Sequence, residues 1–204
     1  MQAAGIKARS KRAFRPRTTD SHHPHPIAPN RLKTHPAPTA PNQVWVADIT
    51  YIWTLEGWIY LAAVMDLFSR KIVGWALAPT METALVKEAL QRALASRQPA
   101  AGLLHHSDRG SQYASSAFRA FLHSWQIKPS MSGPACCYDN AAMESFWSSL
   151  KTEIPSPAPF ENIQTARRAI FNYIETFYNP RRLHSALDYQ SPVDFETKTN
   201  YKQN

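Results

Sequence analysis

The sequence has only two cysteines among its 204 residues, and it has no long apolar run. Cys136 and Cys137 are adjacent, so they offer no intrachain disulfide framework and favour a reducing compartment. Their spacing also does not match the ligand pairs of structural zinc sites. The longest apolar run, residues 58–65, is far shorter than the roughly 20 residues of a membrane-spanning helix. We therefore expect neither a secreted disulfide scaffold nor a membrane protein.

Acidic residues are almost missing from the first 41 residues, which contain eight basic residues and one acid, Asp20. Seven of the 16 prolines also lie there, and the segment shows almost no periodic apolar pattern. Residues 42–204 contain 15 basic and 14 acidic residues, so most of the net charge of +8 belongs to this arm. A basic arm on a near-neutral domain indicates a polyanionic partner such as DNA. A solvated tail and an organellar transit peptide are the alternatives for the same segment.

The apolar periodicity after residue 42 predicts a mixed sheet flanked by helices. Three runs rich in β-branched and aromatic residues, 44–53, 58–67 and 71–77, predict an antiparallel meander. A helix from a Thr80 cap to about residue 97, a buried strand over 102–107 and a helix over 115–125 follow. We then expect a short strand at 127–129, a helix over 139–151 capped by Asp139, and a last helix over 162–178. The predicted division is an arm or linker over 1–41, one domain over 42–196 and a tail over 197–204.

Three carboxylates fall on three different predicted elements. Asp48 interrupts a strand, where an unpaired acid is costly to bury, and Asp108 follows the strand over 102–107. Glu144 shares one face of the helix over 139–151 with Asn140 and Lys151. For each acid alone, a solvated position is the alternative, and for Asp108 and Glu144 it is the ordinary one. Together they could converge on Mg²⁺, which carboxylates and water hold for phosphate chemistry.

The segments around these acids resemble the orfB-type transposases of bacterial insertion sequences, the IS-three family, which share the retroviral-integrase core. Asp108 and Glu144 are separated by 35 residues, and the resemblance extends over residues 18–196. It is carried by several motifs in order, namely WVADITYI at 45–52, HSDRGSQY at 106–113, CYDNAAMESF at 137–146, NPRR at 179–182, HSAL at 184–187 and SP at 191–192.

This resemblance implies an RNase H-like fold with a five-stranded mixed sheet and a DDE active site of Asp48, Asp108 and Glu144. In that family, Mg²⁺ or Mn²⁺ ions, expected to be two, allow water to cut a phosphodiester and the freed 3′-hydroxyl to attack another strand. Lys151 matches the family's basic position and is expected to contact a DNA phosphate. Asn140 is expected to orient Glu144 or a bound water. Arg109, Arg181 and Arg182 are the further candidates for DNA binding or support.

The resemblance also implies partners and a location. DNA of the element ends and of the target, an orfA-derived DNA-binding protein or fusion domain, and further copies of the chain are expected. The place of action would be the bacterial cytoplasm, near the nucleoid. Residues 1–9 resemble only the tail of the family's helix-turn-helix region, so we expect a chain truncated at its amino terminus. Two positions depart from the family pattern, Pro134-Ala135-Cys136 before Glu144, which predicts less efficient catalysis, and Leu183, which predicts a mild effect.

Other functions stay open from the residues alone. A truncated chain could bind DNA without transposing, and an RNase H-like nuclease could act on RNA in hybrids. A glycosidase with paired carboxylates would explain neither the basic arm nor the third acid. A histidine base is disfavoured, since His105 and His106 are consecutive strand residues that face opposite sides.

Overall fold

The computed structural model describes residues 23–133, 140–154 and 159–203. Within them one sheet of five strands has the order β3-β2-β1-β4-β5. Strands β1 (Val44–Thr54), β2 (Gly57–Asp66) and β3 (Ile72–Ala78) form the antiparallel meander that the sequence predicts. Strands β4 (Leu104–Ser107) and β5 (Lys128–Met131) continue the sheet in parallel with β1. The mixed five-stranded sheet is therefore confirmed.

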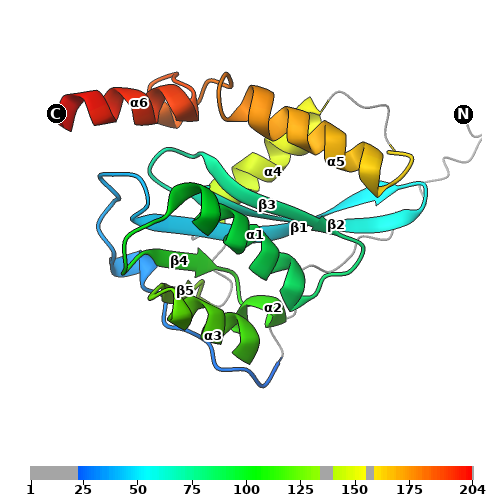
Figure 1. The fold of residues 1–204 in the computed structure, drawn as a ribbon, viewed down its shortest axis with the longest axis horizontal. Coiled ribbons are helices and arrows are strands. Elements are labelled where there is room, and N and C mark those ends of the chain that lie inside the picture. The colour runs from blue at the N-terminus through cyan, green and yellow to red at the C-terminus, as the bar shows by residue number, and fades with distance from the viewer. Residues whose placement is uncertain (1–22, 134–139, 155–158, 204) are drawn as a thin grey trace, which may run out of the picture.

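Helices cover both faces of this sheet (Figure 1). One apolar cluster joins the sheet to α1 (Thr83–Arg97), α2 (Ser111–Ala114) and α3 (Ser116–Ser124). A second cluster joins the opposite face to α4 (Ala141–Glu153), α5 (Ile163–Phe171) and the π-helical continuation η4 (Asn172–Tyr178). Fully buried Trp45 and Phe118 lie in the first cluster, and Met65, Phe146 and Ile170 lie in the second. The sheet is thus buried on both sides, as its nearly continuous apolar strands require.

Some element boundaries differ from the sequence prediction. Helix α1 begins at Thr83 with Glu82 at its cap position, so Thr80 is not the cap. The predicted cap Asp139 lies outside the described residues, and Asn140 is the residue that precedes α4. Helix α6 (Pro192–Gln203) was not predicted, although Ser191 followed by proline is a helix-start signal and its Oγ accepts the Asp194 N–H at 3.2 Å. None of the helices in the described residues has the length and apolarity that crossing a membrane requires.

The described part of the arm lies along the domain. A 3₁₀ turn η2 (Leu32–Thr34) interrupts its extended course, and Leu32 packs against the second apolar cluster. The backbone N–H groups of Arg31 and Leu32 donate to Ser130 Oγ on β5 at 3.0 and 3.3 Å. The described part of the arm therefore contacts the domain through Arg31 and Leu32. Residues 1–22 lie outside the described part.

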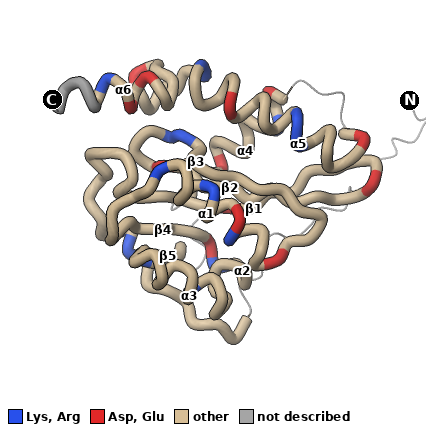
Figure 2. Tube along the Cα trace, viewed as in Figure 1, with Lys and Arg blue, Asp and Glu red and all other residues tan. Residues whose placement is uncertain are grey.

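Charges of both signs are distributed over the helices and the strand ends, while most of the sheet is uncharged (Figure 2). This distribution agrees with the near balance of 15 basic and 14 acidic residues after residue 41.

Candidate active site

Asp48 and Asp108 are brought together by the pairing of β1 with β4. The parallel register pairs Val46 of β1 with His106 of β4. Asp48 is two residues after Val46 in the chain, and Asp108 is two residues after His106. Asp108 lies just past the end of β4, and its charge raises the pKa of Asp48, so the two carboxylates are within electrostatic range of each other. The pairing of two strands that are far apart in the chain thus brings together two acids that are 60 positions apart in sequence.

Two donors hold the Asp48 carboxylate. The indole Nε1–H of Trp147 donates to Asp48 Oδ2 at 2.9 Å, and the backbone N–H of Ile49 donates to Oδ1 at 2.8 Å. Burial and the charge of Asp108 nevertheless raise the pKa of Asp48 to about 7, and the charge of Glu144 adds to the increase. The hydrogen bonds only partly offset this effect. A proton or a cation would relieve the repulsion among these acids.

Asp108 lies in the turn after β4, where its Oδ1 accepts the N–H of Gly110 at 2.9 Å. A Cβ on Gly110 would lie 3.0 Å from this same Oδ1, so the turn is closely fitted around the carboxylate. Burial, and then the charges of Asp48 and Asp108, raise the pKa of the buried Tyr113 phenol. Tyr113 is therefore near both aspartates. Asp108 and Asp48 thus belong to one electrostatic site.

Glu144 reaches the site from α4, the helix over the second face. It is exposed and lies one turn before Trp147, so these two side chains project from the same side of the helix. Its charge contributes to the raised pKa of Asp48, which places it in electrostatic range. Among the described residues, no three His, Cys, Asp or Glu side chains are close enough together to hold a metal ion as they stand. The three acids are therefore neighbours around an open site and do not form a closed cage.

Lys151 and Asn140 lie at opposite ends of the same helix. The Lys151 Nζ is 4.6 Å from the centre of the Tyr51 ring, three residues along β1 from Asp48. Asn140 precedes α4 and is buried, and its Oδ1 has no hydrogen-bond partner within the part of the chain that the structure describes. Lys151 thus lies beside the strand that carries Asp48, and Asn140 offers an acceptor one turn before Glu144.

The three arginine candidates have different surroundings. Arg109 donates through Nε to the Ser132 carbonyl at 2.7 Å, which ties the Asp108 turn to the end of β5. Arg182 forms a bidentate pair with Glu153 at the last turn of α4, with its shortest contact at 2.7 Å. Arg181 is exposed. From the sequence Arg182 is a candidate for DNA binding, but in the structure its guanidinium is paired with Glu153 of the same chain.

The histidines on β4 face opposite sides of the sheet, as strand geometry predicts. His105 packs 5.5 Å from the Phe118 ring in the first cluster, and burial lowers its pKa to about 3. His106 contacts Ser130 and Ser132 at 2.8 and 3.1 Å on the other side. His184 packs 4.9 Å from Tyr178, and burial lowers its pKa to about 4. His105 and His184 thus have apolar or aromatic surroundings, which do not favour a role as a base.

Sequence reasoning missed Trp147 as a partner of Asp48. The signal available was its spacing of three residues from Glu144, which places both on one helical face. Nothing local identifies Asp48 as its acceptor, since 99 residues separate the two. The Pro134-Ala135-Cys136 segment lies outside the described residues, so the predicted effect of this departure stays a prediction.

Comparison with known proteins agrees with this geometry. Two family models described as integrase core domain match residues 38–137 and 125–192. Over 193 residues the chain is 49% identical to an insertion element IS600 uncharacterized 31 kDa protein of Shigella sonnei, covering 95% of this chain and 71% of that protein. Over 198 residues it is 41% identical to the transposase InsF for insertion sequence IS3A of Escherichia coli K12, covering 97% of this chain and 68% of that protein. The chain belongs to the IS3 family of insertion-sequence transposases.

Family membership makes this IS3-family chain a DNA transposase with an integrase-type core, a DDE polynucleotidyl transferase. It also favours DNA transposition over the hybrid nuclease, the glycosidase and the inactive remnant. Among solved structures, the HTLV-2 integrase catalytic core domain in complex with magnesium, in its trimeric form, superposes with a TM-score of 0.60 at 16% identity, covering 78% of this chain and 98% of that one. That likeness confirms the RNase H-like fold.

Proposed function

We propose that Asp48, Asp108 and Glu144 are the catalytic carboxylates of this IS3-family transposase. The observation that supports the proposal is the raised pKa of Asp48, to which the charges of Asp108 and Glu144 both contribute, together with the parallel pairing of β1 with β4 that leads toward the two aspartates. Two acids placed close together repel each other when both are ionised, which raises the free energy of the folded protein, so such an arrangement is uncommon without a functional reason. A buried acid with a raised pKa next to a second acid, as at Asp48, is typical of functional sites.

The same three residues would hold Mg²⁺ or Mn²⁺, and we propose two ions. The donors fit, since all are carboxylates, which hard divalent cations prefer, and their mutual repulsion favours a cation between them. When bound, such ions supply charge stabilisation of the phosphate and lower the pKa of the attacking hydroxyl. The magnesium in the HTLV-2 integrase core supports the choice of ion for this chain.

The chain's own groups hold this site in place. Trp147 and the Ile49 N–H fix the two oxygens of Asp48, and the Gly110 N–H fixes one oxygen of Asp108. Lys151, beside β1, would contact a DNA phosphate. The Asn140 Oδ1, which has no hydrogen-bond partner among the described residues, would orient a water or Glu144. In the hydrolytic step a water oxygen bonds to phosphorus, the bond to the 3′-oxygen breaks, and that oxygen takes up a proton. In strand transfer the freed 3′-hydroxyl replaces water as the attacking group.

The proposed partners are the DNA of the element ends and of the target, bound partly through the basic arm over residues 1–41. Arg109 and Arg181 are proposed to support this binding, and Arg182 acts through its pair with Glu153. An orfA-derived DNA-binding protein and further copies of the chain complete the proposed assembly, which would work at the nucleoid in the bacterial cytoplasm. The trimeric form of the HTLV-2 integrase core supports self-association.

The test is nicking of a labelled DNA duplex by the purified chain with Mg²⁺ or Mn²⁺. We expect Asp48→Asn, Asp108→Asn and Glu144→Gln each to lower the nicking rate by about 1,000-fold or more, because each removes a group of one catalytic unit. DNA affinity should be unchanged or higher, because repulsion of the phosphates falls. Glu161→Gln, an exposed acid before α5, is the matched control and should nick like wild type. Retained nicking in any of the three variants would contradict the assignment of that residue.

A further inference from the structure

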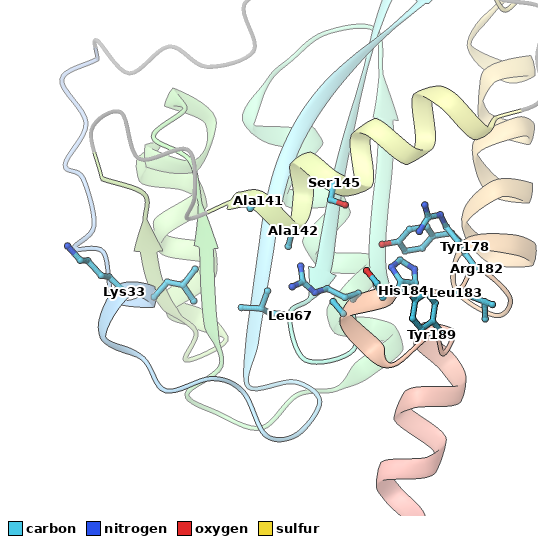
Figure 3. A pocket seen from close by; sticks show the side chains of 14 residues that line it. Lys33, Leu67, Ala141, Ala142, Ser145, Tyr178, Arg182, Leu183, His184 and Tyr189 are labelled. Atoms are coloured by element: carbon cyan, nitrogen blue, oxygen red, sulfur yellow. The ribbon is translucent and has the colours of Figure 1, made fainter.

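A cavity of about 760 Å³ lies beside α4, outside the carboxylate site. Its walls come from four parts of the chain: the arm near Leu32 and Lys33, the turn between β2 and β3, the first turns of α4, and the segment over 178–189. Figure 3 shows Arg182, His184 and Tyr189 grouped on one side and Lys33 on the other, with Ala141, Ala142 and Ser145 of α4 between them. The proposed function leaves this cavity unused.

The charge of the cavity wall is of one sign. Lys33, Arg70 and Arg182 line it, and none of the lining residues is an Asp or Glu. Glu153 pairs with Arg182 from outside the wall. Arg70 has no ion pair with any carboxylate in the described part of the chain, and burial lowers the pKa of its guanidinium. A half-buried cation without an acid is unfavourable on its own and favours a bound anion.

The wall that carries Arg182 also presents an exposed ring on strained backbone. Tyr189 is 72% exposed and Leu183 is 60% exposed. Tyr189 has a φ of 56°, a left-handed conformation that bulky residues rarely adopt. Four backbone hydrogen bonds within residues 184–190 hold it there, including the Tyr189 N–H to the His184 carbonyl at 2.9 Å. Backbone strain that projects a ring into solvent is typical of ligand-binding loops.

The cavity is adjacent to the catalytic helix. Ala141, Ala142 and Ser145 line it, and Glu144 belongs to the same turn of α4. The N-terminal end of a 13-residue helix also carries partial positive charge, which favours an anion at this wall. A polymer with regularly spaced phosphates could therefore occupy the cavity and the carboxylate site at once.

We propose that this cavity binds a backbone phosphate of the DNA strand held at the carboxylates, with Arg70 facing the phosphate and Tyr189 facing the adjoining sugar or base. This inference rests on the proposed function, since it extends the DNA path from the carboxylate site along α4. Arg70 is thus a DNA-binding residue and not a catalytic one.

The test is the salt dependence of DNA binding, measured by fluorescence anisotropy with a labelled duplex that carries a single-stranded 3′ overhang. All proteins carry Glu144→Gln, so that cleavage cannot alter the probe. We expect Arg70→Gln to reduce the slope of log affinity against log salt by about 0.7 to 0.9, the loss of one phosphate contact. We expect Tyr189→Gly to weaken binding about threefold without changing this slope, since it removes stacking and not charge.

Lys87→Gln on α1 removes one positive charge far from the cavity and is the matched control, with affinity and slope expected to be unchanged. Thermal midpoints guard against misfolding, and Tyr189→Gly should not lower the midpoint, because glycine tolerates the positive φ. If Arg70→Gln had the same slope as the parent protein, the inference would be overturned. It would also be overturned if Lys87→Gln lowered the affinity and the slope as much as Arg70→Gln does. Nicking by the chain with an unmodified Glu144 tests the proposed function separately. Nicking without a slope change at Arg70 would therefore count against the cavity alone, and a slope change without nicking would count against the catalytic proposal alone.

Discussion

At the scale of single residues, the site depends on how Asp48 is kept ionised beside another acid. Burial and Asp108 favour its protonated form, whereas the Trp147 and Ile49 hydrogen bonds favour the carboxylate. Trp147 also contacts Phe146, with ring centres 4.8 Å apart, so its indole is fixed by packing. Trp147 is therefore a positioning residue that links α4 to the strand carrying Asp48.

We predict that Trp147→Phe lowers the nicking rate about tenfold at pH 7 and raises the metal concentration needed for half-maximal rate. Loss of the donor raises the pKa of Asp48 further, so less carboxylate is available, and the deficit should narrow at higher pH. Rates measured across pH and Mn²⁺ concentration test this. Trp125→Phe, an exposed ring at the end of α3, is the control. A uniform loss at every pH and metal concentration would indicate a packing defect instead.

At the scale of elements, α6 is attached to the sheet by a buried ionic network. Glu196 accepts both guanidinium N–H groups of Arg97 at 2.8 and 2.9 Å, and the Ser69 hydroxyl at 2.7 Å. Lys71 approaches it at 3.4 Å from the turn between β2 and β3. This turn also carries Arg70 of the cavity. The last helix thus holds the turn that presents Arg70.

We predict that Glu196→Gln lowers the free energy of unfolding by about 2 kcal/mol at pH 7, because the partly buried Arg97 and Lys71 lose an anionic partner, although Arg97 keeps Asp66 at 3.7 Å. Burial alone would raise the pKa of Glu196, but the hydrogen bonds from Arg97 and Ser69 and the charges of Arg97 and Lys71 leave it lowered. The unfolded state therefore binds the proton first as pH falls, and the stabilisation present at pH 7 is lost below about pH 4.5.

Urea denaturation at pH 7 and at pH 3 to 4 checks both parts of this prediction. The difference between wild type and Glu196→Gln should shrink at the lower pH. Glu88→Gln breaks an exposed pair with Arg92 and should cost less than about 1 kcal/mol. Equal midpoints for wild type and Glu196→Gln at pH 7 would show that the network adds no net stability.

At the scale of the whole molecule, charge and fold are divided between different parts of the chain. Residues 42–204 are nearly neutral, whereas the first 41 residues carry seven of the eight excess positive charges. The described end of the arm reaches the site itself, since His23 Nε2 lies 2.9 Å from the Arg109 carbonyl, next to Asp108. The described end of the arm therefore lies beside the turn that carries Asp108.

We predict that deleting residues 1–22 reduces the slope of log DNA affinity against log salt by at least about 2, because six basic residues are removed. The deletion keeps the hydrogen bonds from the Arg31 and Leu32 N–H groups to Ser130 Oγ, so we expect the domain to stay folded. Replacing the same six residues by Gln in the full chain should give the same slope, which separates charge from length. An unchanged slope in either protein would refute a role of this segment in DNA binding.

Much of the fold could be predicted from the sequence because its signals are local. The runs 44–53, 58–67 and 71–77 are rich in β-branched and aromatic residues, which favour strands, and they form β1, β2 and β3 with small changes at their ends. The start of α1 was less predictable, since Thr80 resembles a cap in sequence but the helix begins at Thr83. Helix α6 was missed because its apolar pattern is weak and its main anchor, Glu196, acts through residues about 100 positions away.

The sequence by itself determined the family motifs, the three acids on three different elements, and the concentration of positive charge in the arm. It did so because motif spacing, apolar period and charge count are properties of neighbouring residues. Only the tertiary structure decided that Trp147 donates to Asp48, that Arg182 pairs with Glu153, and that Arg70 lines a cavity without an acid. These are contacts between segments joined by strand pairing and helix packing, and no local pattern encodes which distant partner a side chain meets.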